Sequence, residues 1–179
     1  MTANNPLLQD FDLPPYSQIK PEHVEPAVDQ ILADSRTAIA KLLEQQQANP
    51  SWDGLVLALD ELGARLGRAW SPVSHLNAVC NSAELRAAYE ACLPKLSEYW
   101  TEMGQNKPLF EAYDALAKSP AAVDFDVAQQ TILEHALRDF RLSGIDLPAE
   151  QQKRYGEIQM RLSELTSKFS NQLLDATQA

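Results

Sequence analysis

The sequence predicts an all-α protein of about six helices, preceded by a proline-rich extended arm at residues 1–20. Apolar residues recur at spacings of three and four in several segments, which is the period of one helix face. Pro21, Ser51, Ser82 and Pro148 each suit the first turn or N-cap of a helix and precede such a segment. No segment shows the strict polar and apolar alternation of a half-buried strand. These observations together favour a helical array over any sheet.

The first 20 residues are predicted to be extended because prolines interrupt them. Pro6, Pro14 and Pro15 prevent a long helix there. Large apolar side chains are scattered through the segment: Leu7, Leu8, Phe11, Leu13 and Tyr16. A free tail would have little reason to carry them, so we expect the arm to be held against a helical surface. The remaining residues, 21–179, are then a helical domain that is incomplete.

The next 85 or so residues are predicted to contain three long helices. The first begins at Pro21, where a missing amide proton costs nothing, and ends in the polar stretch "EQQQANP". The second follows Ser51 and reaches toward Pro72. The third follows Ser82 and should kink near Pro94 without breaking, because its apolar stripe keeps its phase across the proline. The predicted buried sides are Val24, Val28, Ile31, Ile39 and Leu42; Leu55, Leu59, Leu62 and Leu66; and Leu85, Tyr89, Cys92, Leu96, Tyr99 and Met103.

Three further helices are predicted to follow. A short one lies around residues 109–118, and the next carries Leu133 and Phe140 and ends at Gly144, which can adopt the left-handed conformation of a C-terminal cap. The last begins at Pro148, and its apolar stripe runs on without a closing glycine or proline. That stripe consists of Tyr155, Ile158, Leu162, Leu165, Phe169 and Leu173. We expect that the chain is a piece of a longer polypeptide, and that the separated piece covers part of this stripe by self-association.

Charge and composition argue against several partner classes. The formal net charge of -10 opposes a partner whose affinity depends on neutralising phosphates, so no nucleic-acid partner is expected. No apolar run approaches the roughly 20 residues that span a bilayer, and "MTANNPLLQD" lacks the basic and apolar regions of a signal peptide. Cys80 and Cys92 form no CxxC pair, which fits a cytoplasmic protein, and Cys92 is expected to be a buried thiol.

No catalytic, cofactor-binding or metal-binding residue is predicted in this chain. The sequence contains no HExxH, ExxH, GxSxG, GxxxxGK[ST] or GxGxxG motif. The nearest approach to an acid/base pair is His135 with Asp139, beside Glu134, for which a helix-surface contact is the preferred interpretation. A second polar group in "SPVSHLNAV" comprises Ser71, Ser74, His75 and Asn77. It would line a cleft or, as the preferred interpretation, satisfy the backbone of a proline-bent helix junction.

Three stretches, which follow one another along the chain in the same order as in a known family, carry a resemblance to it: "FDLPPYSQIKPEHVEPAV", "SPVSHLNAVCNSAELRAAYE" and "LRDFRLSGIDLPAEQQKRYGEIQMRLSELTSKFSNQLLDAT". They resemble the N-terminal region of the thimet-oligopeptidase-like zinc metallopeptidases, and they cover most of the chain. The resemblance implies a mostly helical enzyme that cuts short unfolded peptides in a channel between two lobes. It also implies a zinc ion held by an HExxH helix and a downstream glutamate, which lie far beyond position 179 in that family. This chain would then build channel wall, with the missing catalytic domain as its partner and no chemistry of its own.

The alternative function is a free-standing helical module that binds other proteins. Tandem-repeat adaptors show self-similarity at a period of about 30 to 45 residues, which this sequence lacks, but a non-repeating module stays open. An open reading frame that continues past Ala179 into HExxH would favour the peptidase, and a stop codon would favour the module. In either case the chain alone is predicted to bind no zinc and to hydrolyse no peptide.

Overall fold

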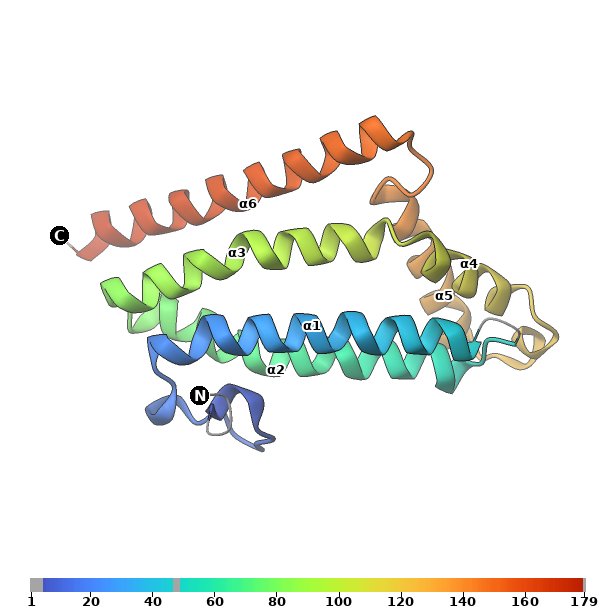
Figure 1. The fold of residues 1–179 in the computed structure, drawn as a ribbon, viewed down its shortest axis with the longest axis horizontal. Helices are drawn as coiled ribbons and strands as arrows, with labels where there is room; N and C mark the ends of the chain where they lie inside the picture. The colour runs from blue at the N-terminus through green and yellow to red at the C-terminus, as the bar shows by residue number, and fades with distance from the viewer. Residues whose placement is uncertain (1–4, 47–48, 179) are drawn as a thin grey trace.

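The computed structural model describes residues 5–46 and 49–178, and these residues form six α-helices and no strand. The helices are α1 (Pro21–Gln46), α2 (Ala58–Val79), α3 (Ala83–Gly104), α4 (Lys107–Ala117), α5 (Val127–Leu142) and α6 (Ala149–Gln178). The all-α prediction is confirmed. Figure 1 shows α1, α2, α3 and α6 running lengthwise beside one another, with α4 and α5 gathered at one end. Three predicted segments fall partly outside the described residues: positions 1–4 of the arm, 47–48 of the polar stretch and 179 of the last helix.

The first three long helical segments begin at the predicted residues, and side-chain caps mark two of these starts. α1 begins at Pro21. The Ser82 hydroxyl accepts a hydrogen bond from the Leu85 amide at 3.2 Å, which caps α3. The Ser51 hydroxyl accepts one from the Gly54 amide at 3.1 Å and starts a π-helical turn, residues 52–57, that leads into α2.

Prolines lie inside α2 and α3 without ending either helix. α2 continues past Pro72 to Val79, beyond the predicted end near the proline. Pro72 and the adjacent Val73 are both buried, so packing offsets the hydrogen bond that the proline removes. α3 is likewise continuous through Pro94, and Figure 1 shows it bending near its middle, as the prediction of a kink requires.

Two clusters of buried side chains stabilise the fold. The first lies between α1, α2 and α3 and includes Val24, Val28, Ile31, Leu66, Val73, Leu85, Cys92, Leu96 and Tyr99. The second lies at the end where α4 and α5 meet α1 and the π-helical turn, and comprises Leu42, Leu55, Val56, Leu109, Leu116, Leu133 and Phe140. Most predicted core positions are therefore buried. Leu59, Leu62, Tyr89 and Met103 are only partly buried.

The described part of the arm is held to the first cluster, as predicted, but over only part of its length. Leu7 is buried, and Leu8 and Ile19 pack against the same cluster. The Asn5 side chain donates a hydrogen bond to the His23 carbonyl at 2.7 Å. Leu13, by contrast, is 82% exposed. The apolar residues of the arm thus divide into anchors and a solvent-facing loop.

Candidate functional site

His135 and Asp139 of α5, considered as an acid/base pair and not preferred as one, share no hydrogen bond among the described residues. His135 and Asp139 are both exposed, and the Asp139 carboxylate accepts a hydrogen bond from Arg138 at 2.9 Å. The preferred interpretation, a helix-surface contact between His135 and Asp139, is therefore not observed, and the partner of Asp139 is Arg138. Within the described part of the chain, no group of three or more His, Cys, Asp or Glu side chains is placed to hold a metal ion.

The polar residues of "SPVSHLNAV" all lie on α2, with Ser71, Ser74 and His75 on one side of the helix and Asn77 turned away from His75. Ser71 and His75 are exposed, and the His75 ring lies 5.5 Å from the Tyr16 ring of the arm. The Asn77 side chain, on another side of the helix, accepts a hydrogen bond from the Asn81 amide group at 2.9 Å. Two residues of separation correspond to roughly 200° around a helix, so His75 and Asn77 do not face a common site.

α6 packs on α3 through small and polar residues, not through its apolar stripe. The half-buried positions on the α3 side of α6 include Gln152, Gly156, Gln159, Ser163, Ser167 and Asn171. The apolar stripe lies about a third of a turn away. Its aliphatic and Phe residues, from Ile158 to Leu173, are between 42% and 68% exposed. The prediction that these residues share one helix face is confirmed, but α3 does not cover that face.

Polar contacts hold α6 in this orientation at both of its ends. Near its C-terminal end the Arg86 guanidinium donates two hydrogen bonds to the Asp175 carboxylate, at 2.6 and 3.0 Å. These bonds lower the pKa of Asp175 and raise that of Arg86. At the other end the Gln105 amide group donates to the Ser143 carbonyl at 3.0 Å, and the Gln152 amide group donates to the Gly144 carbonyl at 3.1 Å.

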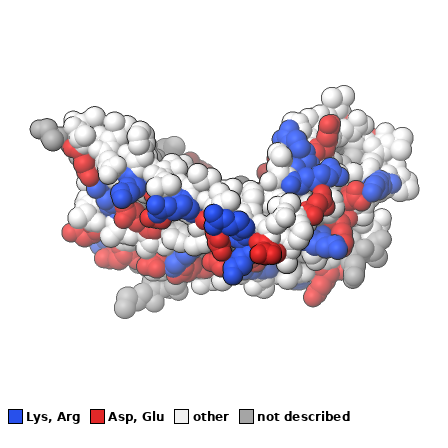
Figure 2. All heavy atoms as spheres, turned by 90° about the horizontal axis from the view of Figure 1, so that it is seen from above, with Lys and Arg blue, Asp and Glu red and all other residues white. Residues whose placement is uncertain are grey.

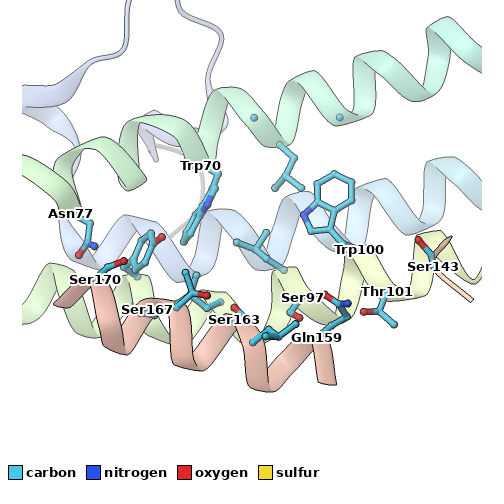
Figure 3. Close-up of a pocket in the computed structure, with 18 of the residues that line it drawn as sticks. Trp70, Asn77, Ser97, Trp100, Thr101, Ser143, Gln159, Ser163, Ser167 and Ser170 are labelled. Carbon is cyan, nitrogen blue, oxygen red and sulfur yellow. The ribbon is translucent and has the colours of Figure 1, made fainter. Parts of the chain in front are cut away.

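A groove of about 620 Å³ lies between α2 and α6 over α3, and we call it the α2–α6 groove. Figure 3 shows that Trp70 of α2 and Trp100 of α3 lie in it, opposite a wall of α6 that carries Ser163 and Ser167. Trp70 stacks on Tyr89, with ring centroids 4.8 Å apart, whereas Trp100 is 55% exposed. The groove therefore offers aromatic surface on its floor and small hydroxyl groups on one wall.

The α2–α6 groove is uncharged among the described residues. Its lining contains no Asp, Glu, Lys, Arg or His. The groove on the other side of the α3–α6 contact is rich in charge and is lined by Glu90, Glu157, Arg161, Glu164, Lys168 and Asp175. Figure 2 shows basic and acidic side chains interspersed over one face of the molecule, whose outline is hollowed. Local sequence reasoning identified only Asn77 of the uncharged groove as a cleft residue, because the other lining residues come from α2, α3, α6 and Ser143 at the end of α5 and form no motif.

Comparisons with known proteins show what the chain is similar to. Residues 28–153 match the family described as Neurolysin/Thimet oligopeptidase, N-terminal domain. Oligopeptidase A of Haemophilus influenzae is 55% identical over 177 residues, which cover 99% of this chain and 26% of that protein. Oligopeptidase A of Escherichia coli is 51% identical over 173 residues, covering 97% of this chain and 25% of that protein. A probable cytosolic oligopeptidase A of Arabidopsis thaliana is 34% identical over 98% of this chain.

The chain spans about a quarter of the length of these relatives. Among the described residues, no helix is both long enough and apolar enough to cross a membrane.

Proposed function

Because this chain belongs to the family of neurolysin/thimet oligopeptidase N-terminal domains, we propose that it is the helical N-terminal region of a zinc metallo-oligopeptidase. The whole enzyme hydrolyses short unfolded peptides, and this region forms part of the wall of its substrate channel. One observation carries the proposal: nearly the full length of this chain aligns with only a quarter of proteins named oligopeptidase A. The catalytic residues then belong to the remaining three quarters of the polypeptide.

The packing of the long helices suits a channel wall. α1 has 26 residues and α2 and α3 have 22 each, so at 1.5 Å per residue each is roughly 33 to 39 Å long. One buried cluster joins all three helices. A channel that selects peptides by width needs a stiff boundary, and close-packed helices resist deformation. The contribution of this region is mechanical, and the peptide bond is cut elsewhere.

Among the residues that the structure describes, no set of side chains fits a catalytic zinc site. The three histidines lie on α1, α2 and α5, and the His23 Nδ1 atom already accepts a hydrogen bond from the Lys20 amide at 3.1 Å. A zinc site needs several ligands that converge on one point. Zinc is therefore assigned to the polypeptide beyond this region. Both cysteines are free thiols, in keeping with the reducing cytoplasm that we propose as the place of action.

The test compares the full-length protein with residues 1–179. We expect the full-length protein to contain stoichiometric zinc by elemental analysis, to cleave a fluorogenic peptide and to lose that activity in the presence of a chelator. Residues 1–179 should neither contain stoichiometric zinc nor cleave the peptide, because they lack a set of zinc ligands. Peptide cleavage by residues 1–179 alone, or a full-length protein without zinc and activity, would contradict the proposal. A stop codon directly after Ala179 would favour the interaction module instead.

A further inference from the structure

The exposed apolar stripe of α6 and the α2–α6 groove form one continuous surface. Tyr155 and Leu162 belong to both, since they are members of the stripe and also line the groove. Trp100 exposes 55% of its surface in the same groove, and Phe169 exposes 68% on the neighbouring face of α6. Contiguous apolar surface of this kind, without a charge in the groove, is typical of an interface and not of a solvated face.

The two sides of α6 differ in a way that shows which one meets water. The groove that contains Glu90, Arg161 and Lys168 carries charges of both signs, which is typical of a solvated surface. The α2–α6 groove is lined by residues from the same two helices, α3 and α6, together with α2, yet its lining has no charge. Because depletion of charge marks the centre of interfaces, the α2–α6 side has the composition of an interface.

The shape of the surface suits a helix. The stripe from Tyr155 through Ile158, Leu162 and Leu165 to Phe169 has spacings of three, four, three and four, which is the pattern of a seam between two helices. On the opposite wall, Gly63 and Gly67 lie one turn apart, and a Cβ atom added at either would meet nothing within 4 Å. The space above α2 therefore admits a close neighbour.

We propose that a helix from the polypeptide following residue 179 in the full-length protein occupies the α2–α6 groove and packs against the stripe of α6. This inference rests on the proposed function for the existence of that polypeptide, since the relatives are about four times as long as this chain. α6 ends at the same end of the molecule as the turn between α2 and α3, near Asn77 and Ser170 of the groove (Figures 1 and 3). A helix that follows can thus enter the groove there and run antiparallel to α6.

In the full-length protein a second copy of the chain is a poorer occupant than an attached helix, whereas the separated 179-residue piece, which lacks such a helix, is still expected to self-associate. Each copy has a formal net charge of -10, so burying two copies against each other brings like charges together. A transiently bound peptide is also a poorer occupant, because it would leave the apolar stripe in water between binding events. A covalently attached helix covers the stripe at all times and needs no second molecule.

Photo-crosslinking in the full-length protein tests the proposal. Benzoylphenylalanine replaces Thr166, an exposed residue of α6 that lines the uncharged groove, or Gln172, an exposed residue of α6 that lines the charged groove and is the matched control. We expect position 166 to crosslink to a peptide beyond residue 179 of the same molecule, and position 172 to give no such product. Crosslinks between two molecules, crosslinks only to added peptide substrate, or no intramolecular product at position 166 would each overturn the proposal.

Hydroxyl-radical footprinting gives a second measurement that needs no substitution. In the full-length protein, the labelling of Trp100 should fall about tenfold below that expected for a side chain that is 55% exposed, because buried side chains are only a few per cent exposed. Leu13, which is 82% exposed on the arm, is the internal control and should stay labelled. Strong labelling of Trp100 would overturn the proposal. Peptide hydrolysis is measured separately, so an inactive protein refutes the proposed function without deciding the docking.

Discussion

Replacing Gly63 or Gly67 with alanine should stabilise the 179-residue chain. Both glycines lie in the interior of α2 and are exposed. An added Cβ would meet no atom within 4 Å at either position, so the substitution introduces no clash. Alanine in place of glycine inside a helix gains about 0.5 to 1 kcal/mol, because the unfolded chain loses conformational freedom. The double variant should therefore gain about 1 to 2 kcal/mol.

Gly144→Ala is the matched substitution that should destabilise the 179-residue chain. Gly144 has φ +87°, in the left-handed region, where a residue with a Cβ atom costs roughly 1 to 2 kcal/mol. Its Cβ would also lie 2.8 Å from the Leu147 Cδ1 atom. The same chemical change is thus expected to destabilise the chain at this position and to stabilise it in α2.

Urea unfolding followed by far-UV circular dichroism measures all three variants. For a chain of this size, 1 kcal/mol also corresponds to a shift in Tm of about 2 to 4 °C. A loss of stability in Gly63→Ala or Gly67→Ala of the 179-residue chain would refute the reasoning, because it would mean that another part of the chain fills the space above α2. In the full-length protein the gain should shrink or reverse, since the docked helix would meet the added methyl groups.

Three further predictions concern α6, the second cluster and the cysteines. Hydrogen bonds from Arg86 lower the pKa of Asp175. The contact therefore stabilises the end of α6 above the ordinary pKa of 3.8, and this stabilisation is lost as the pH falls through the lowered pKa. Amide exchange near the end of α6 should depend on pH in this range, and Asp175→Asn should remove that dependence. Leu116→Ala, at a side chain with 0% exposure, should cost about 2 to 5 kcal/mol by urea unfolding, and a cost under 1 kcal/mol would contradict the described packing. Burial raises the pKa of the Cys92 thiol to about 12, so a disulfide reagent at pH 8 should label only the exposed Cys80 until the chain unfolds; rapid labelling of both thiols would disprove the burial.

The sequence was sufficient to predict the helices because their determinants are local. A serine or proline at a helix start acts on amides within one turn, and Ser82 and Pro21 begin helices where expected. Periodicity also identified the buried side of α1, where Val24, Val28 and Ile31 are almost fully buried. It did not predict that α2 would continue past Pro72, because that outcome depends on burial by residues from other helices.

The last helix shows the limit of the same argument. Periodicity correctly placed Ile158, Leu165 and Phe169 on one face, yet α3 meets a different face of α6, which carries Ser163 and Ser167. A repeat in the sequence states which residues share a face, but not which neighbour covers that face. The rotation of the helix depends on its contacts with α3, which are distant in sequence, and the ion pair between Arg86 and Asp175 is one of them.

The sequence by itself determined the fold class, the helix starts, the family resemblance and the expectation that this chain holds no catalytic site, because each depends on neighbouring residues or on motifs. Only the tertiary structure decided that an uncharged groove lies between α2 and α6 and that the apolar stripe of α6 borders it. The groove combines Gly67, Trp100 and Ser167, which are brought together by the packing of three helices. No local pattern encodes such a surface, because its form depends on how each helix is rotated against the others.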